Sequence, residues 1–194
     1  AAKQISPHLR PGTVVVNKST VPVGSTLLVA QALGRSDIPV VSNPEFLRED
    51  SAVDDFLHPD RVVIGSDDQA AARRVASLYV NCGAPIMVTD PASAETCKYA
   101  ANAFLAAKLS FTNAIAAVCE AVGADVSDVL LGMGYDHRIG HEFLRPGPGW
   151  GGSCFPKDSK AIISIAEDAG YDFGLMRSVI QVNDEQFDRI VRKV

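Results

Sequence analysis

The sequence predicts an α/β fold in which a segment with a mostly parallel sheet precedes an all-helical segment. Up to residue 90, short apolar runs alternate with helical stretches, which is the pattern of βαβ units. Residues 92–122 then form one stretch without Gly or Pro that is rich in Ala. Further helical patterns lie on both sides of a Gly/Pro-rich stretch, residues 132–156, that has no periodicity. The chain therefore divides near residue 90 into an α/β half and a helical half.

Four short apolar runs predict strands, because continuous apolar stretches of this length are typical of strands buried on both faces. They are residues 13–17, 39–42, 61–65 and 86–89. Helices are predicted at 23–33, where Gly34 is a stop signal, and at 69–80. The second half is predicted to hold one long helix and three shorter ones, at 92–122, 125–131, 157–169 and 175–194.

Composition excludes several classes of protein. The chain has 194 residues, of which 47% are hydrophobic, so it can bury a core without disulfides or a metal. Its 18 Lys and Arg against 23 Asp and Glu give a net charge of −5, which argues against nucleic-acid binding. No uninterrupted apolar run reaches the roughly 18 residues that cross a bilayer. We therefore expect neither a nucleic-acid nor a membrane partner.

The cysteines and histidines indicate a reducing setting and no metal. The four cysteines form no CxxC pair, and Cys82, Cys97 and Cys119 are expected to be small buried hydrophobic residues. Without a secretory context, a cytoplasmic location fits this pattern better than a pair of disulfides. The four histidines are scattered, so no metal site is expected.

The segment GPGWGGSCFPKD, residues 147–158, is the most informative for function. Its glycines would let the backbone approach a ligand closely and expose its N–H groups. Cys154 stands at the entry to a predicted helix, where the helix dipole and Lys157 would favour the thiolate. Asp158 could act as a general base or orient a water molecule. The alternative is a Gly-rich loop that carries a buried cysteine.

Two more candidate segments follow predicted strands, where open parallel sheets bind ligands. Residues 43–50 carry carboxylates and an arginine that could bind a polar substrate, or could form a solvated loop that starts a helix. Residues 18–24 carry hydroxyls and N–H groups at a predicted helix start, which suit a phosphate or a nicotinamide ribose. There the alternative is plain N-capping by Ser19 or Thr20.

A fourth candidate lies within the long predicted helix. Lys98 and Asn102 are four residues apart and therefore project from one face of that helix. They could simply face solvent. Near a reactive cysteine, they could instead stabilise an oxyanion.

These four segments, in this order, resemble the UDP-glucose/GDP-mannose dehydrogenase family. They are KSTVPVG at 18–24, NPEFLRE at 43–49, Lys98 with Asn102, and GGSCFPKD at 151–158. Residues 56–61, 138–140 and 143–147 also resemble the branch that acts on UDP-glucose. The resemblance covers essentially the whole chain. It implies a two-step oxidation of a sugar C6 alcohol to a carboxylate, here UDP-glucose to UDP-glucuronate, with two NAD.

The resemblance also implies catalytic roles. Cys154 would trap the aldehyde as a thiohemiacetal, and loss of hydride would give a thioester that water hydrolyses. Asp158 and Glu49 would serve as base and position the water. Lys98 and Asn102 would stabilise the oxyanion.

Binding roles follow from the same resemblance. Thr20 is expected near the nicotinamide or a catalytic water, and Glu49 and Lys157 near the cofactor. The residues that the resemblance places around the UDP-sugar are Glu45, Phe46, Leu47, Arg48, Glu49, Lys98, Asn102, Phe143, Leu144, Arg145, Pro146, Gly147 and Gly151.

The family's strand–GxGxxG–helix unit does not occur in this sequence, which starts at Ala1 and stops at Val194. The resemblance therefore predicts a central fragment that is inactive alone. Residues 1–90 would be the C-terminal half of an NAD-binding Rossmann-like domain, and 91–194 the helical central domain, with a homodimer through helix 92–122. The alternatives are a 6-dehydrogenase for GDP-mannose or a UDP-N-acetyl sugar, or a non-catalytic dimerisation module.

Overall fold

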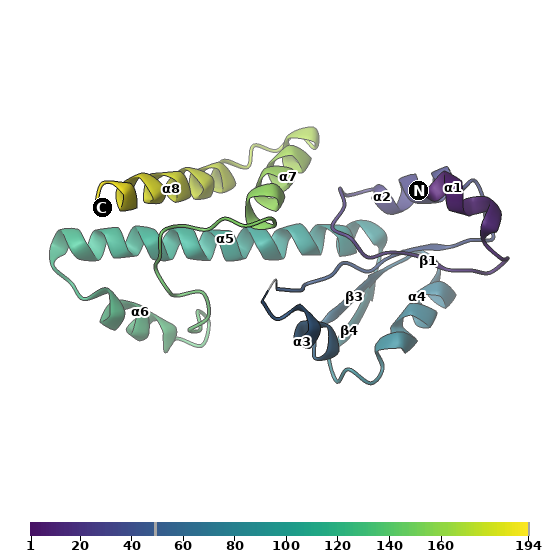
Figure 1. Ribbon diagram of the computed structural model, residues 1–194, viewed down its shortest axis with the longest axis horizontal. Coiled ribbons are helices and arrows are strands. Elements are labelled where there is room, and N and C mark those ends of the chain that lie inside the picture. Colours follow the sequence, from purple (N-terminus) through teal and green to yellow (C-terminus); the bar gives the residue numbers. More distant parts are fainter. Residues whose placement is uncertain (49, 194) are drawn as a thin grey trace. The chain divides into compact units, whose positions relative to one another are not determined.

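The structure, a computed structural model, describes residues 1–48 and 50–193 (Figure 1). The chain forms two compact units, Ala1–Lys98 and Tyr99–Val194. The first contains a four-stranded sheet with helices, and the second is all-helical. The predicted α/β fold class is confirmed.

The sheet has the order β1-β2-β3-β4. Its strands are β1 (Val15–Asn17), β2 (Val40–Ser42), β3 (Val62–Gly65) and β4 (Ile86–Thr89). β1 pairs with β2 and β3 with β4 in parallel, as predicted for βαβ units. β2 and β3 instead pair antiparallel, at Ser42 and Gly65, so the sheet is mixed.

Helices cover both faces of the central strands β2 and β3, whereas Met87 and Val88 of β4 are exposed. The helices of the first unit are α1 (Ala2–Ile5), α2 (Ser25–Leu33), α3 (Ala52–Leu57) and α4 (Gln69–Ala76), with 3₁₀ turns η1 (Ser6–His8) and η2 (Ser77–Tyr79). Val41 packs in one core cluster with Ala71, Ala72 and Val75 of α4. Its neighbour Val40 packs in another with Leu33 of α2. Since successive strand residues point to opposite faces, α4 and α2 lie on opposite sides of the sheet, as Figure 1 shows.

The second unit is organised along a long helix. α5 (Pro91–Val122) begins in the first unit and ends before Gly123, which has a φ of 72° that suits a helix stop. The helices that follow are α6 (Val126–Gly134), α7 (Phe155–Asp168) and α8 (Gly174–Val191). Buried residues of α5 and α8 form a core with Trp150; they are Ala103, Ala106, Met176 and Val179.

The helix α5 is both long and apolar. Although the sequence holds no uninterrupted apolar run of membrane-spanning length, α5 has an 18-residue window of mean hydropathy 1.3 that is 28% buried. By length and composition alone it could cross a membrane. A helix that packs in a core or an interface meets the same criteria, so this observation is weak evidence for a membrane span.

Candidate active site

The loops that follow β1 and β2 begin side by side. β1 and β2 are parallel, with Asn17 opposite Ser42, so both strands end at the same edge of the sheet. The backbone N–H of Asn43 donates to the carbonyl of Asn17 at 2.9 Å. The two candidate segments 18–24 and 43–50 therefore start together at the edge where such sheets bind ligands.

The N-terminus of α2 is occupied by Glu95, which sequence reasoning missed. The Glu95 side chain is buried, and its carboxylate accepts from the Gly24 N–H at 2.6 Å and from the Thr26 N–H at 2.8 Å. It also accepts from the Thr26 hydroxyl at 2.7 Å. These amides are therefore not open to the phosphate predicted for this helix start.

The predicted N-cap by Ser19 or Thr20 is also wrong. The N-cap of α2 is Gly24, whose φ of 92° lies in the left-handed region, and the helix begins at Ser25 instead of residue 23. Thr20 lies in the loop between β1 and α2 and is partly buried. It is thus near the carboxyl end of β1, but it does not start the helix.

Lys98 pairs with the second loop. Its side chain is 5% exposed, and its Nζ lies 3.5 Å from Oε1 of Glu45 and 5.5 Å from the ring centre of Phe46. Glu45 Oε2 in turn accepts from the N–H of Leu47 at 2.7 Å. The expectation that Lys98 simply faces solvent is therefore wrong.

A second lysine shares this environment. The pKa of Lys18 is lowered overall, chiefly by burial. Glu45 raises this pKa in part, and Lys98 adds to the lowering. Glu45, which also pairs with Lys98 at 3.5 Å, therefore interacts electrostatically with both lysines. The carboxyl end of β1 and the start of α5 therefore present two cations around one carboxylate, which suits a negatively charged ligand.

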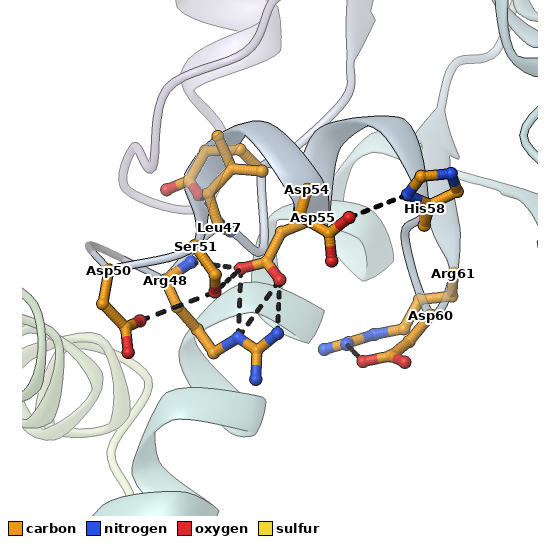
Figure 2. Close-up of polar contacts among 10 residues, drawn as sticks. Leu47, Arg48, Asp50, Ser51, Asp54, Asp55, His58, Asp60 and Arg61 are labelled. Atoms are coloured by element: carbon orange, nitrogen blue, oxygen red, sulfur yellow. Dashed lines mark hydrogen bonds and ion pairs between the residues drawn. The ribbon is translucent and has the colours of Figure 1, made fainter.

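Arg48 is bound within its own segment (Figure 2). Its guanidinium forms an ion pair with Asp55 of α3, with Nη2 at 2.5 Å from Oδ1, and its backbone N–H donates to Oδ2 at 2.7 Å. The Ser51 hydroxyl also donates to Asp55. The Arg48 guanidinium holds the pKa of Asp55 well below its usual range. Arg48 thus closes the loop onto α3, while Glu49 lies outside the described residues.

Phe46 packs between two cations. The guanidinium carbon of Arg61 lies 3.8 Å from its ring centre, on a side chain that also lies within 4.0 Å of Asp60. With Lys98 also near the ring, the segment is held at Glu45, Phe46 and Arg48. The alternative of a freely solvated loop is therefore not what the structure shows.

Cys154 begins α7, as predicted. It is the N-cap of the helix, is partly exposed, and has its Sγ 3.5 Å from the Ser153 hydroxyl. Asp158 stands one turn later and is buried. The helix dipole favours negative charge at this end of α7, which suits a thiolate at Cys154.

Asp158 holds two other candidate residues. Its Oδ2 accepts from Nδ2 of Asn102 at 2.6 Å, and Nζ of Lys157 lies 2.8 Å from Oδ1. The contact between Lys157 and Oδ1 is an ion pair without the alignment of a regular hydrogen bond. Asp158 nevertheless raises the pKa of Lys157. A smaller contribution to that rise comes from Cys154. Asn102 is buried, so it does not face solvent either.

The segment 143–147 is fastened by its backbone. The carbonyl of Phe143, a residue with a φ of 63°, accepts from the Thr112 hydroxyl at 3.3 Å. The N–H of Gly147 donates to Asn113 at 2.8 Å, and its carbonyl accepts from Gln186 at 2.6 Å. The exposed candidate residues of this region are Arg145, Pro146 and Gly151, whereas Leu144 is buried.

Trp150 is a core residue rather than an exposed ring. Its indole N–H donates to Ser110 at 2.8 Å, and its backbone N–H and carbonyl both bond to the amide of Asn183. Trp150 also packs edge-on against Phe155. The Gly-rich loop is therefore anchored in the core a few residues before Cys154.

The other three cysteines are wholly or partly buried. Cys119 is buried, Cys82 and Cys97 are partly buried, and all four cysteines are free thiols. Within the described part of the chain, no three His, Cys, Asp or Glu side chains form a group that could hold a metal.

Known proteins match both units. Residues 1–82 match the NAD binding domain, and residues 92–185 the central domain, of the UDP-glucose/GDP-mannose dehydrogenase family. The chain is 52% identical to UDP-glucose 6-dehydrogenase TuaD of Bacillus subtilis, over the whole chain and 43% of the relative. It is 47% identical to UDP-glucose 6-dehydrogenase of Rhizobium meliloti, again over the whole chain and 46% of the relative.

Solved structures agree. A UDP-glucose dehydrogenase from the archaeon Pyrobaculum islandicum superposes with a TM-score of 0.88 at 42% identity, over 95% of this chain and 44% of that one. GDP-mannose dehydrogenase from Pseudomonas aeruginosa gives 0.66 at 32% identity, over 95% of this chain and 45% of that one. The chain thus spans less than half the length of these relatives.

The first unit is thus an NAD-binding domain segment and the second a dehydrogenase central domain. More particularly, the chain belongs to the UDP-glucose/GDP-mannose dehydrogenase family.

Proposed function

We propose that the protein takes part in the NAD-dependent four-electron oxidation of UDP-glucose to UDP-glucuronate. The observation that carries this proposal is Cys154 at the N-terminus of α7, one turn before a buried Asp158 that binds Asn102 and Lys157. The identity of about half of all residues with proteins named UDP-glucose 6-dehydrogenase supports this substrate.

The edge of the sheet where β1 and β2 end fits a dinucleotide, because open α/β sheets bind nucleotides at the carboxyl ends of parallel strands. Thr20 lies in the loop after β1, and we propose it as the residue nearest the nicotinamide or a catalytic water. Glu49 and Lys157 are proposed to lie near the cofactor. The pyrophosphate must bind elsewhere than at α2, because Glu95 fills the N-terminus of that helix. Each of the two oxidations would need a bound NAD as acceptor of one hydride, two NAD in all.

Covalent catalysis by Cys154 accounts for the second oxidation. The first oxidation yields an aldehyde at C6, and the Cys154 thiolate adds to its carbonyl carbon to form a thiohemiacetal. Hydride loss from that carbon yields a thioester. Water then adds to the thioester carbonyl, and the carbon–sulfur bond breaks to release the carboxylate and the thiol.

Four groups are proposed to serve these steps. Lys98, a buried cation, and Asn102, whose amide is oriented by Asp158, would stabilise the negative oxygen of each tetrahedral species. Asp158 and Glu49 would take the proton and position the water. The UDP-sugar would bind along segments 45–49 and 143–147 and at Gly151.

The decisive experiment replaces the thiol. We expect Cys154→Ala in the full-length protein to abolish formation of UDP-glucuronate, measured by chromatography of the product. Cys82→Ala, which changes another partly buried free thiol, should leave product formation unchanged. Undiminished UDP-glucuronate from Cys154→Ala would sink the proposal.

Related sugar nucleotides are the closest alternative. GDP-mannose dehydrogenase of Pseudomonas aeruginosa shares 32% of residues with this chain, less than the proteins named for UDP-glucose. We therefore expect kcat/KM to be highest for UDP-glucose when it is compared with GDP-mannose and UDP-N-acetyl sugars. A preference for one of the other substrates would reassign the substrate without changing the chemistry.

We also propose that the protein is a cytoplasmic homodimer that associates through residues 92–122 of α5. Large apolar side chains on this helix are exposed at seven-residue intervals, at Phe104, Phe111 and Val118. Four free thiols agree with a reducing compartment.

A non-catalytic dimerisation module would show the same exposed apolar side chains on α5, but it would not require a thiol at a helix N-terminus. Titration of NAD into this chain tests the module: binding at ordinary affinity would argue against it. We expect weak binding by this chain, because its sequence contains no GxGxxG motif, so the activity of the full-length protein separates the two.

A further inference from the structure

The Glu95 carboxylate is a buried charge that the proposed chemistry does not use. It accepts three hydrogen bonds of 2.6 to 2.8 Å, from the Gly24 N–H, the Thr26 N–H and the Thr26 hydroxyl. These partners are 69 and 71 residues away in the sequence, so the bonds join α5 to the start of α2. A carboxylate at this position is favoured by the dipole of α2 and uses amides that have no partner within the helix.

Glu95 lies one turn from Lys98 on α5. Whereas Glu95 holds the end of segment 18–24, Lys98 pairs with Glu45 in the neighbouring loop. The first turns of α5 therefore hold both loops that begin side by side after β1 and β2. Two buried charges of opposite sign, three residues apart, perform these two tasks.

The start of α5 is itself pressed against the sheet. A Cβ on Gly65 of β3 would lie 2.5 Å from the Cβ of Ala94 and 2.8 Å from the carbonyl oxygen of Asp90. Only glycine allows this approach, so the turn that carries Glu95 rests directly on strand β3. Glu95 therefore links segment 18–24 to the turn of α5 that packs on the sheet.

We infer that Glu95 is a positioning residue: its carboxylate fixes the segment 18–24, which carries Lys18 and Thr20, relative to Lys98. Both Glu95 oxygens are engaged at the start of α2, so we assign Glu95 no direct role in the reaction. The inference rests on the proposed function for its effect on rate, but the clamp itself is measurable without any activity.

The test uses Glu95→Gln in the full-length protein. The amide oxygen of Gln can still accept from Thr26, but its NH₂ group cannot accept from the Gly24 N–H. We expect amide hydrogen exchange at Gly24 to rise about tenfold or more, since a hydrogen bond to a charged group is lost. We expect kcat to fall by about 10- to 100-fold, with KM for UDP-glucose changed by less than about twofold, because misplaced catalytic groups affect the reacting complex.

Glu120→Gln is the matched control. Glu120 is an exposed carboxylate on the same helix that pairs with Arg189 and Lys193, so its neutralisation should change neither exchange at Gly24 nor kcat. Thr26→Val provides a milder second variant, because it removes only the hydroxyl contact. It should shift exchange and kcat in the same direction as Glu95→Gln, by a smaller factor, even if Glu95→Gln fails to fold.

The outcomes are distinct. Unchanged exchange at Gly24 in both variants would overturn the clamp. Raised exchange with unchanged kcat would overturn the positioning role. A lack of dehydrogenase activity in the unsubstituted protein would instead overturn the proposed function, while the exchange rates would still decide whether Glu95 holds the segment.

Discussion

Asp158 is buried one turn after Cys154, and both of its oxygens have neighbours. Asn102 donates to Oδ2, and Lys157 lies beside Oδ1. An aspartate engaged in this way holds the side chains of Asn102 and Lys157. Its substitution should therefore change the titration of a neighbour, and not only the rate of a reaction.

We predict that Asp158→Asn lowers the pKa of Lys157 toward its ordinary value. Asp158 is the largest cause of the present rise in the pKa of Lys157, and a neutral amide removes its negative charge. An NMR titration of the Lys157 side chain measures the change. Asp168→Asn, at the other end of α7, is the control; an unchanged Lys157 titration in Asp158→Asn would contradict the ion pair.

Asp55 makes stability depend on pH. Its pKa is held below the unfolded value of about 3.9 by Arg48, so the folded state binds fewer protons than the unfolded state in acid. The stabilisation is therefore fully present above about pH 4 to 5 and is lost as the pH falls from there toward the lower folded pKa.

We predict that Asp55→Asn lowers Tm at pH 6 and that the difference from the unsubstituted protein shrinks below about pH 4. Thermal unfolding between pH 3 and pH 7 measures both. Asp60→Asn, an exposed aspartate that lies 4.0 Å from Arg61, should show a smaller difference at pH 6. A Tm difference for Asp55→Asn that persists unchanged in acid would contradict the ion pair with Arg48.

At the scale of elements, α8 holds the Gly-rich loop at Trp150 through the side-chain amide of Asn183. Asn183 is buried, accepts from the Trp150 N–H at 2.7 Å, and donates to the Trp150 carbonyl at 2.9 Å. The loop also approaches α8 closely at Gly149, where a Cβ would lie 3.0 Å from Asn183 Oδ1. This contact fixes the loop four residues before Cys154.

We predict that Asn183→Ala destabilises the protein by about 2 to 4 kcal/mol, because two buried backbone groups of Trp150 lose their partner. Urea denaturation gives the free energy of unfolding. Gln181→Ala, an exposed residue of α8 that bonds only to Glu185, should cost less than about 0.5 kcal/mol. Equal effects of the two substitutions would show that the Trp150 contact contributes nothing.

The elements themselves could largely be predicted from the sequence. Apolar runs located the four strands, and the absence of Gly and Pro located α5, because both signals are local. α1 and α3 were not predicted, since helices of four and six residues are too short to show a helical period. α7 begins at Phe155, two residues before the prediction, because Pro156 is accommodated in its first turn.

The site was predicted in part. The position of Cys154 at a helix start followed from a local Gly/Pro pattern. The partners of Glu95, Asp55 and Trp150 could not be predicted, because the contacts join residues 71, 7 and 33 positions apart and leave no periodic signal. The predicted domain boundaries, 1–90 and 91–194, stay a prediction for the whole protein.

At the scale of the whole molecule, the long helix α5 carries large apolar side chains that are exposed. Phe104 is 68%, Phe111 53% and Val118 55% exposed, at seven-residue spacing on one helix. Residues seven apart lie on the same side of a helix, so these side chains form one stripe. α5 is therefore apolar on two sides: Ala103 and Ala106 pack in the core, and the stripe is exposed. Together they give the helix its mean hydropathy of 1.3 over 18 residues.

We predict that Phe111→Lys converts a homodimer into a monomer or weakens its dissociation constant by at least about thirtyfold, since removing a central aromatic anchor of an interface costs about 2 kcal/mol or more. Sedimentation velocity over a range of concentrations measures the change. Leu175→Lys is the matched control, because Leu175 is an apolar residue on α8 that is also exposed, at 69%. A dimer that withstands Phe111→Lys but is lost in Leu175→Lys would move the interface from α5 to α8, and a monomer in the unsubstituted protein would contradict the proposed dimer.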